Sequence, residues 1–202
     1  MVTFLPRFSA ESSLKTPLDD CFLLRFLRAR RFDYDGAFCL LCDYYRLHRS
    51  NPELFPPVAN LKPLFEANLL STVTGGRSNL DESVFLLRLG RWDPRKFSFD
   101  DILAAAIKVM EWLTAEDDVA QINGIVSVID MTGFGWSQLR KFGPGLAKKC
   151  IFIMEKCLPI RIKTIFIINE STLADIGFAI IKVRELCVFF LLNDLTKPLF
   201  PT

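Results

Sequence analysis

Apolar positions repeat at helical spacing along the first quarter of the chain. Phe22, Leu23, Phe26 and Leu27 fall on one side of a helix predicted to end near residue 31, and arginines occupy the other side. The acidic pair at positions 19 and 20 precedes it as an N-cap. A second helix is predicted after residue 33, and it ends before the proline at position 52 because the residue preceding a proline disfavours helical backbone. The N-terminal part is therefore expected to be helical.

From residue 52 onward the pattern changes from helical to extended. The proline-rich stretch 52–63 is predicted to be a connector, followed by a short helix at residues 64–70. Gly75-Gly76 and the polar residues 77–83 predict a turn, and the apolar run 84–87 predicts a strand. Two more apolar strands are predicted at residues 124–130 and 164–169.

Helices are predicted between and after these strands. Ser98 and Asp101 form an S-x-x-D capping box ahead of an apolar helix, and Pro144 opens another that ends near Pro159. Residues 173–180 carry apolar side chains at the spacing of one more amphipathic helix. Strands separated by helices imply parallel pairing, so we expect an α/β fold.

The composition is richer in apolar residues than a soluble domain of this size requires. Of the 202 residues, 50% are hydrophobic and 19 are Phe, and the mean hydropathy is +0.27. No apolar run approaches the ~20 residues of a membrane-spanning helix, and the first ten residues do not look like a secretory signal. A large core or a cavity lined by apolar side chains would account for the surplus.

Sequence motifs of the common catalytic and cofactor sites are missing. The chain has no G-x-S-x-G, Walker A or H-x-x-x-H motif. Gly133-Phe134-Gly135 follows a strand, as a dinucleotide loop would, but lacks the third glycine. Asp130, at the end of that strand, fits an N-cap or turn role better than a catalytic one. An enzyme that uses residues 130–135 stays open as an alternative.

The cysteines and the net charge give weaker signals. The six cysteines are scattered and fit reduced thiols of a cytosolic protein. Cys39 and Cys42 lie in a predicted helix of a chain with one histidine, so buried thiols are favoured over a metal site. A formal net charge of +2 is too small to indicate nucleic-acid binding, and we expect no nucleic-acid partner.

The basic residues are more informative because they cluster. Three groups stand along the chain, at Arg25, Arg28, Arg30 and Arg31, at Arg161 and Lys163, and at Lys182 and Arg184. Solvated helix faces are the ordinary explanation of such groups. If the three groups converge in space, they would instead suit phosphate headgroups at an anionic membrane surface.

Several short segments form a recognisable set along the chain. In order, they are Phe22–Arg30 followed by Phe32-Asp33 and Tyr44-Tyr45, Arg91–Pro94, Asn123–Ile125 followed by Asp130, Ala147–Lys149, and Leu158–Lys163 leading to Ile168–Glu170. The set resembles the CRAL-TRIO lipid-binding family, in particular its tocopherol-transfer members. The match extends from about Asp19 to Lys182.

The resemblance implies a fold and a division of the chain. We expect an α/β CRAL-TRIO fold with a small N-terminal helical domain over residues 1–60. The lipid-binding domain would span residues 61–202, with a mostly parallel sheet, flanking helices that form an apolar pocket, and a lid helix from Ser171 onward. Under the resemblance, the expected pocket lining is Leu103, Ala106, Met110, Ile125, Ile129, Phe134, Ile153, Met154, Leu158, Ile160, Ile162 and Ile165.

The resemblance also implies what the protein does. We expect a non-enzymatic carrier that binds a hydrophobic lipid, such as a tocopherol or retinoid, and transfers it between membranes. Phosphoinositide headgroups would bind at Arg30, Arg161 and Lys163 and aid release. No catalytic residue, metal or cofactor is expected, and we expect a cytoplasmic monomer that associates with membranes transiently. The alternative is a regulatory module that senses a phosphoinositide without moving cargo.

Two departures from the family pattern change these expectations. Ala106 and Met110 stand where tocopherol-transfer members place small hydroxyl residues in the pocket, so another lipid fits as well. From Val183 to Thr202 the sequence no longer follows the family, and the expected final strand and closing helix do not appear. We therefore expect a truncated or alternatively spliced product, incomplete at its C-terminal end.

Overall fold

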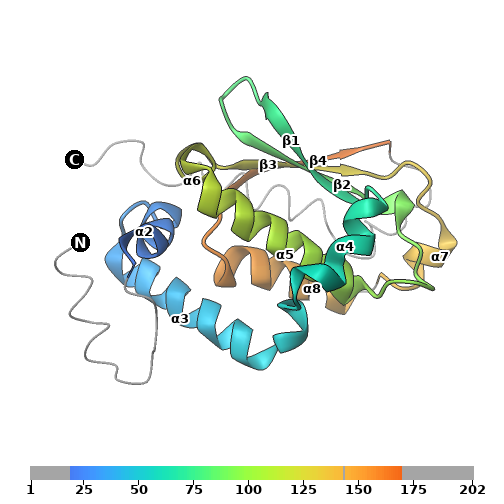
Figure 1. Ribbon diagram of the computed structural model, residues 1–202, viewed down its shortest axis with the longest axis horizontal. Coiled ribbons are helices and arrows are strands. Elements are labelled where there is room, and N and C mark those ends of the chain that lie inside the picture. Colours follow the sequence, from blue (N-terminus) through green and yellow to red (C-terminus); the bar gives the residue numbers. More distant parts are fainter. Residues whose placement is uncertain (1–18, 143, 170–202) are drawn as a thin grey trace.

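A four-stranded sheet forms the upper layer of the described residues in Figure 1, and most of the helices lie below it. The computed structural model describes residues 19–142 and 144–169, so the predicted lid helix after Ser171 and the divergent end from Val183 lie outside the described residues. The strands are β1 (Leu70–Arg77), β2 (Ser83–Arg88), β3 (Ile125–Asp130) and β4 (Ile162–Ile168), and they lie in this order across the sheet.

The strand directions confirm a mostly parallel sheet. β2, β3 and β4 run parallel to one another, and β1 pairs antiparallel with β2 at the edge. Opposite residues in the central three strands include Phe85 on β2, Ser127 on β3 and Ile165 on β4. Because side chains alternate along a strand, these three project from the same face of the sheet.

The two predicted N-terminal helices are confirmed, and so is the cap of the first. α2 (Asp20–Ala29) begins after Asp19, whose carboxylate accepts a hydrogen bond from the Cys21 amide, and α3 (Tyr34–Ser50) begins after Asp33, which caps the Gly36 amide. They share a small core of their own, which is formed by Leu23, Phe26, Leu27, Ala37, Leu40 and Leu41.

The proline-rich connector is more structured than the sequence predicted. It contains a 3₁₀ turn, η1 (Pro52–Leu54), and a full helix, α4 (Val58–Glu66), which includes Pro63. Pro63 forgoes one backbone hydrogen bond, but Leu61 and Leu64 on the same helix are 2% and 1% exposed. Burial of these leucines in the main core therefore outweighs the tendency of proline to interrupt a helix. The helix predicted at residues 64–70 is wrong in its position.

Strand β1 was not predicted, because Gly75 and Gly76 indicated a turn. The glycines instead lie inside β1, where the pairing with β2 shifts register between Thr72 and Arg77. An irregularity of this kind accommodates extra residues in one strand without ending the pairing. The reversal of direction comes later, between Arg77 and Ser83, where the Ser78 amide donates to the Glu82 carbonyl.

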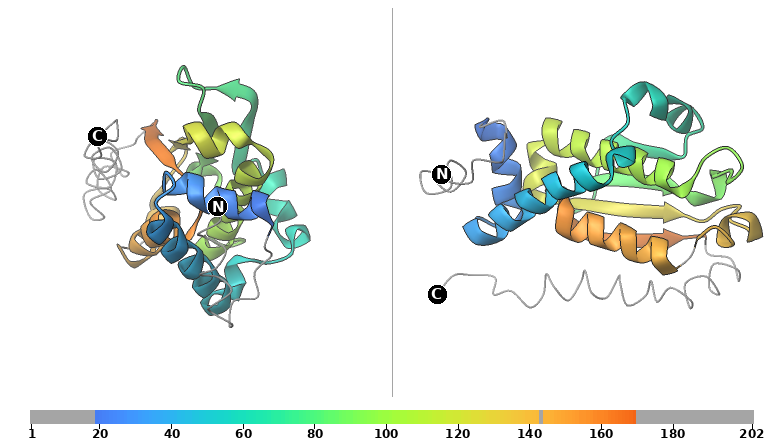
Figure 2. Two further views of the ribbon diagram at one scale, coloured as in Figure 1. Left: turned by 90° about the vertical axis from the view of Figure 1, so that its left-hand side faces the viewer. Right: turned by 90° about the horizontal axis from the view of Figure 1, so that it is seen from below.

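Two long helical segments cover one face of the sheet. α5 (Phe99–Glu116) starts at the predicted capping box, in which the Asp101 amide donates to Ser98 Oγ and the Ser98 amide donates to Asp101 Oδ2. α8 (Pro144–Phe152) continues into a π-helical turn, η3 (Ile153–Cys157), and lies beside α5 under the strands (Figures 1 and 2). Most of the core lies between this layer and the sheet.

The remaining elements are short. η2 (Leu89–Arg91) follows β2, α6 (Asp118–Asn123) leads into β3, and α7 (Trp136–Leu139) follows β3. α7 lies at the end of the molecule opposite α2 and α3 (Figure 1).

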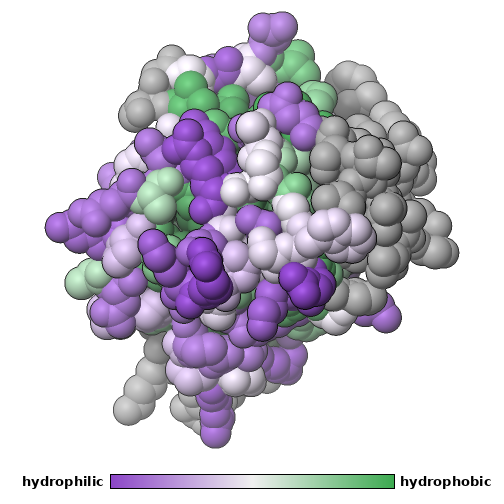
Figure 3. All heavy atoms as spheres, turned by 90° about the vertical axis from the view of Figure 1, so that its right-hand side faces the viewer, coloured by the Kyte–Doolittle hydropathy of each residue, from purple (hydrophilic) through white to green (hydrophobic). Residues whose placement is uncertain are grey.

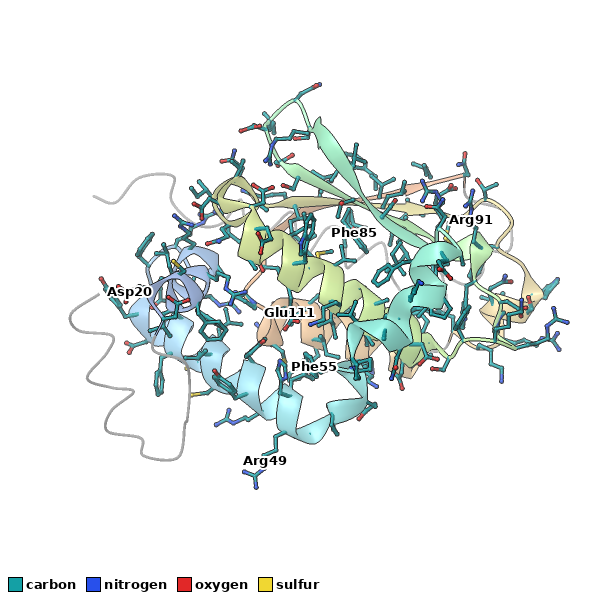
Figure 4. The ribbon with its side chains drawn as sticks, in the orientation of Figure 1. Asp20, Arg49, Phe55, Phe85, Arg91 and Glu111 are labelled. Atoms are coloured by element: carbon teal, nitrogen blue, oxygen red, sulfur yellow. The ribbon has the colours of Figure 1, made fainter. Side chains whose placement is uncertain are left out.

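A polar contact joins the N-terminal helices to α5. The Tyr44 hydroxyl donates a 2.8 Å hydrogen bond to Glu111, and His48 stacks on Phe55 beside it. Glu111 and Phe55 both lie where α3 meets α5 (Figure 4). Burial acts to raise the pKa of Glu111, but the adjacent His48 imidazole, the hydrogen bond from Tyr44 and the nearby Lys108 outweigh it and lower that pKa.

Gly90 allows two loops to pack backbone against backbone. A Cβ at this position would overlap the carbonyl oxygen of Thr132 and lie 2.8 Å from the amide nitrogen of Phe134. We predict that Gly90→Ala lowers the free energy of unfolding by about 2 kcal/mol or more, because the backbone must move to admit the methyl group. Urea unfolding measures this loss.

The matched control is Gly145→Ala in α8, where an added Cβ would meet nothing within 4 Å. That variant should keep or slightly increase the stability, because alanine favours helix. Equal losses in the two variants would contradict the close approach at Gly90.

Candidate functional site

An apolar cavity of about 170 Å³ lies between the sheet and the helices that cover it. Its floor is formed by β2, β3 and β4, and its walls by α5, α8 and η3. Phe85, on β2, lies between the sheet and α5 (Figure 4). The side chains that line the cavity are hydrocarbon apart from the Ser127 hydroxyl and the sulfur atoms of Met110, Cys150 and Met154.

Seven of the twelve residues predicted to line a pocket do line this cavity. They are Leu103, Ala106, Met110, Ile129, Met154, Ile162 and Ile165. The other five lie elsewhere. Ile125, Ile153 and Leu158 are 0–1% exposed within the solid part of the main core, Phe134 packs with Leu89 and Met131 in a separate small cluster, and Ile160 lines a different hollow.

Ten lining residues were missed by the sequence analysis. They are Phe85, Leu87, Leu89, Phe99, Ile102, Ser127, Phe142, Ala147, Cys150 and Ile151. Part of this set had a signal in the sequence, because residues 147, 150, 151 and 154 have the i, i+3, i+4, i+7 spacing of one helix face. Phe85 and Leu87 likewise alternate along a predicted strand.

The apolar surroundings of the cavity wall disfavour charged groups. Burial raises the pKa of the Cys150 thiol to about 12. Since this lies far above neutral pH, Cys150 is a neutral thiol and behaves as a small apolar group. The cavity therefore suits an uncharged, largely hydrocarbon molecule.

A second hollow, of about 440 Å³, lies beside the cavity and carries most of the predicted basic residues. We call it the basic cleft. Arg30, Arg161 and Lys163 all line it, together with Arg31 and Lys156, and its acidic residues are Asp33, Asp43 and Glu155. Two of the three basic groups in the sequence therefore converge, while Lys182 and Arg184 of the third lie outside the described residues. Arg28 of the first group is directed elsewhere and pairs with Asp118.

Specific contacts hold these cations in place. Arg30 Nη2 donates a 2.8 Å hydrogen bond to the Glu155 carbonyl in η3, and Arg161 Nη1 donates to the Ile122 carbonyl at the end of α6. Burial lowers the pKa of Arg30, but a guanidinium stays charged at neutral pH. The stem of Lys163 lies over Gly124, where a Cβ would meet Lys163 Cγ at 2.7 Å.

The cavity and the basic cleft share a wall. Met154 and Ile162 line both of them. Met154 belongs to the π-helical turn η3, whose Glu155 carbonyl accepts the hydrogen bond from Arg30. π-Helical turns recur at functional sites because they distort the regular hydrogen bonding of a helix. A change at Arg30 can therefore reach the cavity through two residues.

The loop considered for an enzyme is held by hydrogen bonds of its own. Asp130 Oδ1 accepts from the Asn169 side chain at 3.0 Å and from the Thr132 hydroxyl and amide at 2.7 and 2.9 Å. These bonds lower the pKa of Asp130 to about 2. A carboxylate so stabilised is a poor general base, and its contacts fit the predicted turn role.

The α7 end of the molecule is mostly hydrophilic (Figure 3). A wide hollow there is lined by basic residues of two loops, together with Trp92, Asp93 and Gln138; the basic residues are Arg91, Arg95, Arg140 and Lys141. Its lining is thus more polar and more charged than that of the cavity.

The described residues contain neither a metal-binding cluster nor a membrane-spanning helix. Among residues 19–142 and 144–169 there is no cluster of histidine, cysteine and acidic side chains that could hold a metal ion. Within the same part of the chain, no helix has the length and apolar content that crossing a bilayer requires.

The fold and the cavity define an α/β protein with an interior suited to an apolar small molecule. The chain belongs to the CRAL/TRIO family, since the family model of the CRAL/TRIO domain matches residues 69–184 and that of its N-terminal domain matches residues 8–43. Members of this family are lipid-binding and transfer proteins.

Individual relatives agree with the family assignment. The chain is 40% identical to the alpha-tocopherol transfer protein-like protein of Mus musculus over 173 residues, and 30% identical to clavesin-2 of Homo sapiens over 167 residues. These alignments cover 84% and 81% of this chain and 49% and 51% of the relatives. The chain thus spans about half the length of the curated relatives it matches.

The fold is also seen in a solved structure, that of Sfh5. The TM-score is 0.50 at 18% sequence identity, over 85% of this chain and 60% of that one. At this level of identity the likeness concerns the fold alone, and it confirms the expected CRAL-TRIO architecture.

The low pKa of Asp130 predicts how its contribution to stability depends on pH. The folded pKa of about 2 lies below the ordinary value near 3.9, so the ionised carboxylate stabilises the fold above about pH 4 and loses this effect as the pH falls toward about 2. The difference in unfolding free energy between the wild type and Asp130→Asn should therefore shrink over that range, as measured by urea unfolding.

Thr132→Val serves as the companion variant because it removes a donor and keeps the carboxylate. It should move the loss of the Asp130 contribution to higher pH. A difference that stays constant with pH would contradict the assigned hydrogen bonds.

Proposed function

We propose that the protein is a non-enzymatic carrier that binds a hydrophobic lipid and moves it between membranes, with release aided by phosphoinositide headgroups. The observation that carries the proposal is the apolar cavity whose wall is shared with the basic cleft. One site suits the hydrocarbon part of a membrane lipid, and the other suits the phosphates at a membrane surface. The carrier would act in the cytoplasm as a monomer and contact membranes transiently.

Transfer requires that burial in the protein compensates for leaving the bilayer. Each buried methylene contributes about 0.8 kcal/mol, so a chain of about a dozen carbons gains roughly 10 kcal/mol relative to water. No chemical change of the lipid is needed.

The size of the cavity limits how a lipid can enter. Pockets that enclose drug-sized ligands are typically ~300 Å³ or larger, whereas the cavity formed by the described residues has about 170 Å³. A whole lipid therefore needs movement of the wall, and the π-helical turn with Met154 is the element placed to supply it.

Headgroup binding would act on that same turn. Arg30 uses one nitrogen of its guanidinium on the Glu155 carbonyl, and a phosphate oxygen competes for such donors because it carries negative charge. When Arg30 turns toward a phosphate, η3 loses an anchor, and the cavity can open where Met154 lies. Binding of an anionic membrane would thus favour release of the lipid.

Filling the cavity should abolish binding of the cargo without unfolding the protein. Ala106 lies in the lining on α5 and is 5% exposed. We predict that Ala106→Phe reduces the lipid that co-purifies with the protein, measured by organic extraction and mass spectrometry, and reduces transfer between vesicles by about tenfold or more, because the ring occupies the space of several methylenes.

The matched control is Ala115→Phe, an exposed position on the same helix. It should bind and transfer lipid like the wild type. Unchanged transfer by Ala106→Phe, with circular dichroism showing a folded protein, would refute the cavity as the cargo site.

Reversing charge in the basic cleft should weaken membrane binding. Each cation near an anionic surface contributes about 1 kcal/mol, so the double variant Arg30→Glu with Arg161→Glu should bind vesicles containing a phosphoinositide more than about tenfold more weakly. Arg49→Glu is the control, because Arg49 projects from α3 away from the body of the molecule (Figure 4). Sedimentation with vesicles measures binding, and equal effects of the two changes would contradict a specific site.

A regulatory module that senses phosphoinositides without moving cargo is the second candidate, favoured by the basic cleft alone. The two sets of variants distinguish it from a carrier. If Ala106→Phe has no effect while the charge reversal abolishes vesicle binding, sensing is the better description.

A further inference from the structure

Buried polar side chains in this fold are almost all hydrogen-bonded. Six polar or charged residues of the described part of the chain are buried, namely Glu82, Ser83, Thr114, Gln121, Ser127 and Gln138. The side chains of five of them are hydrogen-bonded to backbone or side-chain groups, but the Ser127 hydroxyl has no partner among residues 19–142 and 144–169. Ser127 Oγ also differs from His48 Nε2, the one side-chain nitrogen or oxygen atom of the described residues that is both fully buried and without a hydrogen-bond partner, because Ser127 borders the cavity. A polar group so placed in an apolar lining needs a physical reason.

Ser83 shows how the same fold satisfies a buried serine. Ser83 and Ser127 are both 6% exposed and both lie on central strands. The Ser83 hydroxyl donates to Asp117 at 2.7 Å and accepts from Arg77 at 2.9 Å. In the described part of the chain no equivalent groups reach Ser127, so its hydroxyl takes no part in the hydrogen bonding of these elements.

The Ser127 hydroxyl faces the cavity. Ser127 lies opposite Phe85 on one neighbouring strand and Ile165 on the other, and all three line the cavity. Ala106 and Met110, which replace the hydroxyl residues expected from the family resemblance, lie on α5 at the other side of the same space. The hydroxyl group of the lining therefore lies on strand β3 in the floor of the cavity, and not on helix α5, where the family resemblance led us to expect one.

The surroundings do not offer a good site for a trapped water molecule. A buried water usually makes about three hydrogen bonds to polar groups. Among the described residues of the lining, the side-chain heteroatoms apart from Ser127 are the sulfurs of Met110, Cys150 and Met154, which are weak hydrogen-bonding groups. A polar group on a guest molecule is therefore the better partner for the hydroxyl.

We propose that Ser127 Oγ binds an oxygen of the guest, so that the cavity selects a lipid with a hydroxyl group in its buried part over a plain hydrocarbon of the same length. This inference rests on the proposed function as a lipid carrier and adds which residue recognises the cargo. The hydroxyl both donates and accepts, so it matches an alcohol, whose own hydroxyl does the same. An alcohol buried without such a partner would lose its hydrogen bonds to water.

The test compares two probes of equal chain length, 1-octanol and octane, on the wild type and on Ser127→Ala. Their affinities are measured by displacement of a fluorescent apolar dye from the protein. One net hydrogen bond corresponds to about a fivefold to tenfold change in affinity. Ser127→Ala should weaken the affinity for octanol by about that factor. It should change the affinity for octane by less than about twofold, since the alanine methyl group is compatible with hydrocarbon.

Cys150→Ala is the control variant, because it removes the other polar hydrogen from the lining. It should change octanol and octane binding by similar factors. The stability of ligand-free Ser127→Ala provides a second readout. It should stay close to that of the wild type, because the Ser127 hydroxyl makes no hydrogen bond with the described part of the fold and none is lost.

Three outcomes would overturn the inference. If Ser127→Ala leaves both affinities unchanged while the wild type binds both probes, Ser127 does not recognise the guest, and the carrier function stands. A clear loss of stability in ligand-free Ser127→Ala would mean that the hydroxyl has a structural role. If the wild type binds neither probe, the cavity does not take up apolar guests, and the proposed function fails as well.

Discussion

The structure depends on how α5 and α8 cover the sheet without filling the space beneath them. A sheet face of Phe, Leu and Ile side chains must be shielded from water, and α5 does this with a buried run that includes Ala104, Ala105 and Ala106. Alanines allow a helix to be buried while contributing little side-chain volume. Protein interiors are otherwise packed as densely as organic crystals, so an apolar cavity at this point departs from the ordinary outcome of folding. The departure is useful because burial of hydrocarbon is the main force available to hold a lipid.

The same layer also determines how the two candidate sites communicate. The basic cleft forms where the turn between α2 and α3 meets η3 and the start of β4, so residues distant in the sequence supply its cations. Arg30 reaches across to a carbonyl of η3, and the other side of that turn carries Met154 into the cavity. The carbonyl that Arg30 holds and the side chain that lines the cavity therefore belong to adjacent residues of one short turn.

Sequence alone predicted the parts of the fold in which local signals agree with tertiary packing. Asp19 and Ser98 cap the helices that they were expected to cap, the second helix begins after Asp33, and the apolar runs at 84–87 and 124–130 form strands. It failed where packing overrides local preference. α4 forms around Pro63 because its leucines are buried in the main core, and β1 continues through two glycines because β2 offers a partner along most of its length.

The candidate site was partly predictable for a similar reason. Helical spacing gives the face of α5 that lines the cavity, and the same spacing at residues 147–154 would have given that of α8. Which buried residues border empty space and which border one another is decided by three-dimensional packing, and this is why Ile125 and Leu158 lie in solid core while Ile129 and Met154 line the cavity. Ser127 could not be found by an apolar pattern at all. Its meaning appears only once its neighbours are seen to leave the hydroxyl unpaired, since in a strand paired on both sides a serine is otherwise an ordinary residue. Apolar periodicity therefore locates the wall of such a cavity but not the single hydroxyl among its described lining residues.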